Sequence, residues 1–346
     1  MSHCTANKKA TSAFVRRNSI PTTGAVAKAL FNSAIGIDVH HDILVCAYQY
    51  CNRESDEITT EVCSFGTTAS ELAKFTDWCR NHHPEQILME STGVLWFSPY
   101  EALESVGFTN RQLSLINARD FKAIVGRKSD KQDAERLALY ARIGNVRSSF
   151  VPAKCFREMR AVSRLLSKTT DEQSRARSRY LKTLNFIGCR ASSVFSDVRG
   201  KAATAILEVL AEGTREQLID AIKIHGRRLR KSAAEILDAL DFAVSPAMAM
   251  QLRIQKQHME ALSQTCEELY ALLKVMQANY QPWINRLMTV PGIKERAARV
   301  IFAEVTNDLS SFPDAAHLAS WVGVCPGTME SAGKRYSGRA AKGNRY

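Results

Sequence analysis

Short apolar blocks separated by polar turns run along the first part of the chain. The first three blocks have strand length and lie close enough together to form an antiparallel meander. We expect helices where apolar residues recur at helical spacing and stop at a breaker such as His82-His83-Pro84. The pattern predicts strands at 34–38, 43–48, 58–65, 86–89 and 114–116, and helices at about 72–82, 96–105 and 129–143.

This order of elements is that of an α/β ribonuclease H-like domain, which we assign to residues 34–152. Residues 1–33 form a basic arm that we expect to be flexible, because no Asp or Glu precedes Asp38. Such an arm is compatible with an organellar transit peptide, a nucleic-acid contact or a leader without a dedicated role.

The rest of the chain has few strand signals and is predicted to be mainly α-helical. Apolar residues at helical spacing over 156–186 and 246–276 predict two long helices that pair antiparallel with coiled-coil-like packing. A helical insertion at about 200–240 separates them, within a domain of residues 153–285. A last domain, 286–346, completes the chain.

Charge and cysteine content narrow the class of protein. The 47 Lys and Arg against 35 Asp and Glu give a net charge of +12, which favours a polyanionic partner such as nucleic acid. The nine cysteines form no Cys-x-x-Cys pair, so we expect reduced thiols in a cytoplasm and no zinc site. No apolar run reaches the roughly 18 residues of a membrane helix, so we expect no membrane partner.

Four carboxylates fall at positions where they could converge. Asp38 and Glu90 each end a predicted buried strand, and parallel neighbouring strands would bring them together. Asp130 and Asp133 are three residues apart at the start of a helix, where they share one face and the helix dipole tolerates negative charge. Converging carboxylates suit two Mg²⁺ or Mn²⁺ ions of the kind used in phosphoryl transfer.

Each carboxylate also has a simpler interpretation. Asp38 could belong to a turn, Glu90 could cap the following helix, and Asp130 could be a first-turn dipole residue. The joint order is the evidence, since strand-Asp, strand-Glu and helix-Asp-x-x-Asp rarely coincide by accident. His40 and His41 fit loop positions better than ligand positions, and Asp42 and Glu135 are weaker substitutes in the set.

The last domain carries the candidate contacts to nucleic acid. Val290-Pro291-Gly292-Ile293 predicts a helix-hairpin-helix-like unit whose glycine turn lets backbone N–H groups approach a phosphate, and an ordinary turn is the alternative. After Glu330 the chain has no acid and is rich in Gly, Ser and cations, so we expect it to lie on a phosphate backbone. The candidate contact residues are Gly292, Lys294, Lys334, Arg335, Arg339 and Lys342.

Several motifs together resemble the transposases of the insertion sequence 110 family. They are Gly36-Ile37-Asp38, Met89-Glu90-Ser91-Thr92-Gly93, Lys128-Ser129-Asp130-Lys131-Gln132-Asp133-Ala134, Val290-Pro291-Gly292-Ile293 and Ser331-Ala332-Gly333-Lys334. The resemblance implies a RuvC-like domain with an Asp-Glu-Asp-Asp site, joined to a helical domain with a catalytic serine. The expected function is cutting and rejoining of DNA at an insertion sequence.

The resemblance also implies roles and partners. Asp38, Glu90, Asp130 and Asp133 would hold the metal ions, and Ser331 would take the DNA phosphate covalently, with Ser337 as the competing choice. A noncoding RNA of the element would pair with target and donor DNA, and the protein would act as a dimer or tetramer. Relatives usually continue beyond the position of Tyr346 through an arginine-bearing helical segment, so a truncated copy is one expectation.

Three other functions share part of this pattern. A RuvC-like junction resolvase would use the same carboxylates with metal-activated water and would leave Ser331 without a role. An actin-like sugar or acetate kinase also opens with Ile35-Gly36-Ile37-Asp38, but no second glycine-rich phosphate loop follows and the charge of +12 is unusual for it. A non-catalytic nucleic-acid-binding remnant would lack metal binding and strand transfer.

Overall fold

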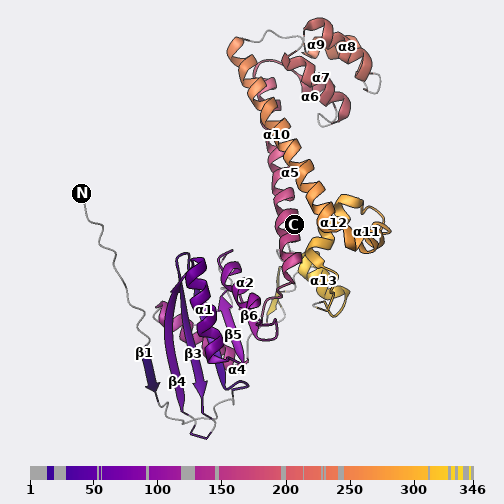
Figure 1. Ribbon diagram of the computed structural model, residues 1–346. Coiled ribbons are helices and arrows are strands. Elements are labelled where there is room, and N and C mark those ends of the chain that lie inside the picture. Colours follow the sequence, from indigo (N-terminus) through magenta and orange to yellow (C-terminus); the bar gives the residue numbers. More distant parts are fainter. Residues whose placement is uncertain are drawn as a thin grey trace, which may run out of the picture. The chain divides into compact units, whose positions relative to one another are not determined.

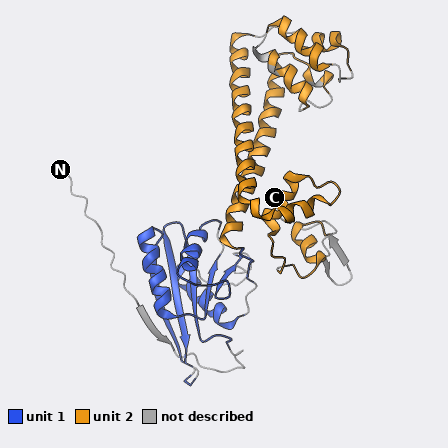
Figure 2. Cartoon of the chain, turned by 45° about the vertical axis from the view of Figure 1, so that its right-hand side comes forward, with its two compact units in different colours: residues 1–152 blue, residues 153–346 orange. Residues whose placement is uncertain are grey.

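The computed structural model divides into two compact units, residues 1–152 and 153–346, which are described separately (Figure 2). The described residues are 29–52, 54–55, 57–90, 93–117, 129–144, 148–195, 200–212, 214–226, 229, 231–240, 245–310, 312–325 and 343, with the backbone alone at 14–18, 192, 208, 211–212, 329–331 and 334–337. Within these residues, no helix combines the length and the apolar character needed to cross a bilayer.

A mixed six-stranded sheet forms the centre of the first unit, in the order β1-β4-β3-β2-β5-β6 (Figure 1). The strands β2, β3 and β4 pair antiparallel as the predicted meander, whereas β5 and β6 continue the sheet parallel to β2. The bounds are β1 Phe14–Asn18, β2 Ser33–Val39, β3 Ile43–Cys51, β4 Ile58–Gly66, β5 Gln86–Glu90 and β6 Leu113–Ile116. This topology and its helices fit a ribonuclease H-like fold. The sequence pattern does not predict β1, which lies in the predicted arm.

The helices of this unit begin and end where local chemistry favours it. Thr68 caps α1, Ala69–His82, which stops at His83 in the left-handed region (φ 44°) directly before Pro84. Ser129 caps α4, Asp130–Ile143, through its side chain, and Gly144 ends it at φ 73°. The third described helix, α2, spans Phe97–Ser105.

Alternation along β2 sends successive side chains to opposite faces of the sheet. Ile35 and Ile37 join the core cluster that contains Phe75 of α1 and Tyr100 of α2. Ala34 faces the other way and packs in a cluster with Leu137 of α4. Helix α4 therefore covers the face that carries residues 34, 36 and 38, and this arrangement decides what surrounds Asp38.

Two long helices dominate the second unit, α5 Lys154–Phe186 and α10 Pro246–Met276. They lie side by side and run antiparallel, as the apolar spacing predicts (Figure 1). Gln255 donates a hydrogen bond to the Thr183 hydroxyl (3.1 Å) at one end of the pair, and Thr170 lies 3.8 Å from the Cys266 sulfur nearer the other end. The helical nature of the C-terminal region is thus confirmed.

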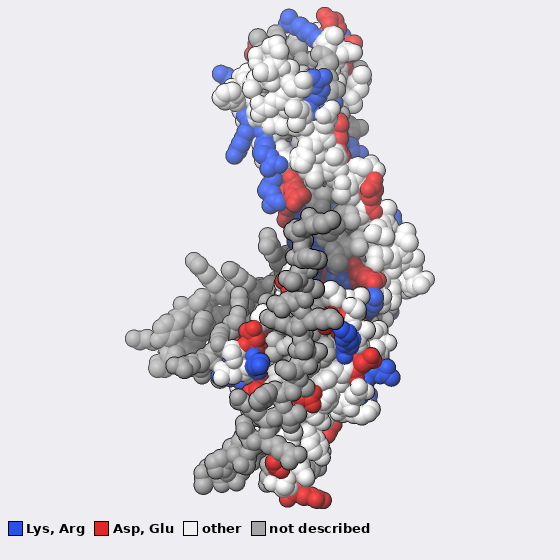
Figure 3. Space-filling view, turned by 60° about the vertical axis from the view of Figure 1, so that its left-hand side comes forward, with Lys and Arg blue, Asp and Glu red and all other residues white. Residues whose placement is uncertain are grey.

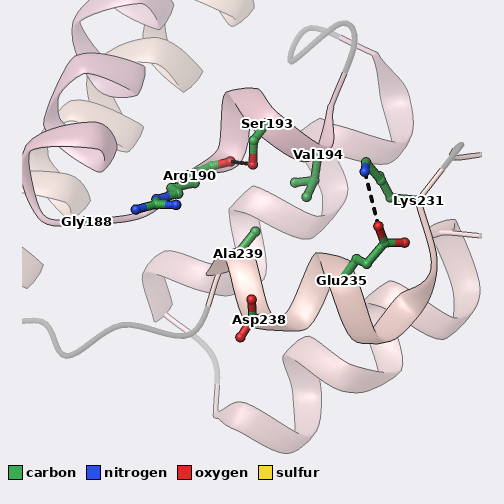
Figure 4. A pocket seen from close by; sticks show the side chains of 8 residues that line it. All are labelled: Gly188, Arg190, Ser193, Val194, Lys231, Glu235, Asp238 and Ala239. Atoms are coloured by element: carbon green, nitrogen blue, oxygen red, sulfur yellow. Dashed lines mark hydrogen bonds and ion pairs between the residues drawn. The ribbon is translucent and has the colours of Figure 1, made fainter.

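The predicted insertion is a group of four helices, α6 Ala191–Val194, α7 Lys201–Glu212, α8 Arg215–His225 and α9 Ala233–Leu240. It has its own apolar core, with Ile206, Ile222 and Ile236 at its centre. A pocket of about 320 Å³ lies between α6, α9 and nearby loops (Figure 4). Its Lys231 ammonium is paired with Glu235 (3.1 Å), so the pocket offers a mixed lining of charges rather than an anion site.

A smaller helical group follows α10 and packs against the N-terminal part of α5. It contains the 3-10 turn η2 Ala278–Tyr280, α11 Gln281–Met288, α12 Glu295–Val305 and α13 Ala315–Val322, followed by the hairpin strands β7 Met329–Ser331 and β8 Lys334–Ser337. Glu304 of α12 is buried and receives two hydrogen bonds of 2.8 Å from Arg164 of α5. This pair fixes α12 to the long helix. The hairpin β7–β8 was not expected from the sequence.

Candidate metal centre

The two strand-end carboxylates lie on neighbouring parallel strands. Ile37 of β2 is in register with Met89 of β5, so Asp38 and Glu90 are the next residues at the same edge of the sheet. Both are buried and, by alternation, both belong to the face that α4 covers. The expectation that parallel strands bring Asp38 and Glu90 to one edge therefore agrees with the sheet register.

Helix α4 can deliver a third carboxylate because it crosses β2 very closely. At Gly36 the space that a side chain would need is filled by backbone atoms of α4, Ala134 O and Ala138 N. Alanines on α4 at 134 and 138 keep the helix surface flat at this crossing. The close crossing lets the first residue of α4, Asp130, reach the end of β2 where Asp38 lies.

Asp38 and Asp130 meet around His40. The His40 Nε2 atom lies 3.0 Å from Asp38 Oδ2 and 3.7 Å from Asp130 Oδ1. One potential ligand atom from each of the three residues falls within 4.8 Å of the other two. The sequence had favoured a loop role for His40, and its position two residues after the strand-end Asp was the only signal that could have pointed to the site.

The charges of the neighbouring carboxylates act on Asp38. Burial raises the pKa of the Asp38 carboxyl, and the nearby charges of Glu90 and Asp130 act in the same direction, while His40 opposes them through its charge and hydrogen bond. Without a cation, ionisation of the Asp38 carboxyl is therefore disfavoured.

The donor set fits a hard divalent cation. Carboxylate oxygens, which Asp38, Glu90 and Asp130 all carry, are the ligands that Mg²⁺ and Mn²⁺ prefer. A dication would offset the burial, and the smaller repulsion from Glu90 and Asp130, that raise the pKa of Asp38. The acidic cluster is consistent with use of a divalent metal.

The remaining acidic candidates lie outside the group formed by Asp38, His40 and Asp130. Asp133 lies one turn along α4 from Asp130, outside the group of three, and its carboxylate is 3.5 Å from Arg136 Nη1. Asp42 is exposed and pairs with His41 at 2.5 Å. Glu135 is half-buried, and its backbone carbonyl accepts a hydrogen bond from Gln49. A role for Asp133 as a metal ligand thus stays a prediction. In that role its carboxylate would leave Arg136 and bind the metal ion instead.

The candidate residues of the last domain are described only in part. Gly292 adopts φ 88° in the turn between α11 and α12, and Lys294, exposed, is the N-cap residue of α12. This turn joins two packed helices, and its assignment as a helix-hairpin-helix unit stays a prediction. The backbone of Ser331 in β7 pairs with Lys334 in β8, next to Arg335, whereas Arg339 and Lys342 lie outside the described residues.

Comparisons with known proteins agree with this geometry. Residues 35–188 match the family model DEDD_Tnp_IS110, described as a transposase, and residues 284–346 match the model described as "Transposase IS116/IS110/IS902 family". The chain is also 28% identical over 162 residues to the "Insertion element IS110 uncharacterized 43.6 kDa protein" of Streptomyces coelicolor. That similarity covers 41% of this chain and 38% of the relative, so the chain matches well under half of the relative's length. The two family models together span both the carboxylate domain and the end of the chain, and the protein belongs to the insertion sequence 110 family of transposases.

Proposed function

We propose that the protein is a transposase that cuts and rejoins DNA strands of an insertion sequence with the help of divalent metal ions. The observation that carries the proposal is the buried Asp38 carboxylate, whose pKa is raised by burial and by the neighbouring charges of Glu90 and Asp130. A cluster that is unfavourable alone and favourable around a dication is expected of a metal site.

In this proposal Asp38, Glu90, Asp130 and Asp133 hold two Mg²⁺ or Mn²⁺ ions, which would supply charge stabilisation at the reacting phosphate. His40 has a positioning role, because its Nε2 lies within hydrogen-bond distance of Asp38 Oδ2. The rigid sheet register fixes Asp38 and Glu90, whereas Asp130 and Asp133 depend on the placement of α4.

Ser331 is the proposed nucleophile, and Ser337 is the competing residue. The serine oxygen forms a new bond to the DNA phosphorus and loses its proton, while the bond from phosphorus to a deoxyribose oxygen breaks and that oxygen gains a proton. A serine hydroxyl is a poor nucleophile at neutral pH, so the step requires a nearby base that accepts the proton or a metal ion that coordinates the serine oxygen. Rejoining reverses the step with a different deoxyribose oxygen.

The proposal includes the partners that the family resemblance implies. These are target and donor DNA, a noncoding guide RNA and further copies of the chain in a dimer or tetramer acting in the cytoplasm. The net charge of +12 supports the polyanionic partners. The cationic residues of the last domain, Lys294, Lys334, Arg335, Arg339 and Lys342, with the Gly292 turn, would contact phosphates.

Trapping a covalent intermediate tests the function and its nucleophile together. The full chain, with Mg²⁺, the noncoding RNA of the element and DNA carrying its boundaries, should give a protein–DNA adduct that mass spectrometry locates on Ser331. The adduct should vanish in Asp38→Asn and in Ser331→Ala. Metal-dependent cleavage without any adduct would instead support a junction resolvase, and an adduct on Ser337 would reassign the nucleophile.

A further inference from the structure

The exposed face of α5 carries a row of cations that the metal centre does not use. No Asp or Glu occurs from residue 173 to residue 196, whereas this stretch contains five Lys or Arg residues. Arg175, Arg179 and Lys182 are exposed and follow the spacing i, i+4, i+7, so they lie on one face of the helix. Figure 3 shows Lys and Arg side chains gathered on one flank of the protein.

These cations are free to bind an anion. Among the described residues, none of Arg175, Arg179 and Lys182 has an acidic partner, in contrast to Arg160 and Arg164 nearer the start of the same helix. Together with the exposed Ser174 and Ser178 they line a shallow hollow of about 360 Å³. The acidic residues Asp171 and Glu172 lie just before the first of these cations, so the row of cations begins at Arg175.

An exposed aromatic side chain continues the row. Phe186 is 81% exposed at the last residue of α5, four residues after Lys182 and therefore on the same face. The apolar core of this region contains Tyr180 and Leu184, which point to the other side of the helix, so packing gives no reason for an aromatic residue at 186. Cations in line with an exposed ring are the combination that binds unpaired nucleic acid, since the cations hold phosphates and the ring stacks on a base.

The length of the row suits a short segment of strand. Seven residues of helix place Lys182 about 10.5 Å from Arg175, and Phe186 lies about 6 Å further. The bases of duplex DNA are stacked on one another inside the helix and cannot stack on an exposed ring. A base of a single strand can rotate outward and stack on it.

We propose that the face of α5 formed by Arg175, Arg179, Lys182 and Phe186 binds single-stranded DNA, with the cations on successive phosphates and Phe186 stacked on a base. The proposal rests on the proposed function in one respect, namely that strand cutting is what exposes unpaired DNA. Binding itself needs neither metal nor cleavage.

The test measures binding of the full chain to one labelled sequence in three forms, single-stranded DNA, duplex DNA and single-stranded RNA. Phe186→Leu keeps an apolar side chain but removes the ring, and should weaken binding of single-stranded DNA by about five-fold or more with duplex binding unchanged. Phe186→Trp should retain tight binding. The same loss on RNA is compatible with the proposal because stacking tolerates either sugar, but a loss confined to RNA would overturn it.

The cations are tested by salt dependence. The triple variant Arg175→Gln, Arg179→Gln, Lys182→Gln should reduce the log-log salt slope for single-stranded DNA by about 2, since each phosphate contact contributes about 0.7. A control triple that removes the same charge from other exposed helical positions, Lys201→Gln, Lys223→Gln, Arg253→Gln, should leave the slope near that of the wild type.

Two further results would overturn the inference: wild-type affinity for single-stranded DNA in Phe186→Leu, or equal slopes in the two triple variants. Unchanged thermal unfolding, expected because the altered side chains are exposed, shows that each variant is folded. Cleavage is measured separately with Asp38→Asn. Loss of strand binding in the α5 variants would therefore support the inference even if no cleavage of DNA were detected in any protein.

Discussion

Replacing Gly36 by alanine tests the account of how the metal centre is assembled. The added methyl group would meet Ala134 O and Ala138 N, which are backbone atoms of α4 and cannot rotate away. To restore ordinary contact distances of roughly 3.5 Å, α4 must move from the sheet by about 1 Å. Such overpacking typically costs about 1–3 kcal/mol, which corresponds to a decrease in Tm of about 3–10 °C for a unit of this size.

The same displacement should separate Asp130 from Asp38, while the sheet keeps Asp38 beside Glu90. We therefore expect binding of Mg²⁺ or Mn²⁺, measured by titration calorimetry, to weaken by about 10-fold, the order found when a positioning residue near a metal is lost. Gly66→Ala is the matched control, because at that position the new methyl group meets the movable Glu71 side chain at 3.1 Å and has a backbone atom, Asp42 O, only at the ordinary contact distance of 3.9 Å. Wild-type Tm and metal affinity in Gly36→Ala would refute the reasoning.

Three further predictions concern charge. In metal-free Asp38→Asn we expect a Tm a few degrees higher, about 1 kcal/mol of added stability, because the substitution removes a carboxylate disfavoured by burial and by Glu90. The variant should not cleave DNA. An unchanged or lower Tm would contradict the account of Asp38 as a disfavoured carboxylate. Because the pKa of Asp38 is raised in the folded state, the metal-free wild type should lose stability as pH rises from the ordinary aspartate pKa near 3.8 through the raised pKa. Urea unfolding measured over that pH range should show this loss in the wild type and not in Asp38→Asn. Glu304→Ala leaves Arg160 and Arg164 without their buried partner and should destabilise the second unit by about 3 kcal/mol in denaturant unfolding. Glu304→Gln should destabilise it less, and equal effects of the two substitutions would show that the charge of Glu304 does not contribute.

The sequence by itself determined the elements of the first unit from β2 onward and the order of the carboxylates. Strand periodicity, caps such as Ser129 and breakers such as His83-Pro84 act within a few residues, so the bounds of β2, β5 and α4 could be predicted closely. Because a parallel pair aligns the ends of its strands, the proximity of Asp38 and Glu90 followed once β2 and β5 were taken as neighbours.

Only the tertiary structure decided which side chains complete the centre. His40 approaches Asp130 across 90 residues of sequence because α4 crosses β2 over Gly36, and no local pattern encodes that crossing. Asp133 points to Arg136 instead, although it shares a helix with Asp130. On α5, sequence spacing placed the cations on one face, but the exposure of Phe186 depends on how the neighbouring helices pack, since an aromatic residue at helical spacing usually belongs to the core.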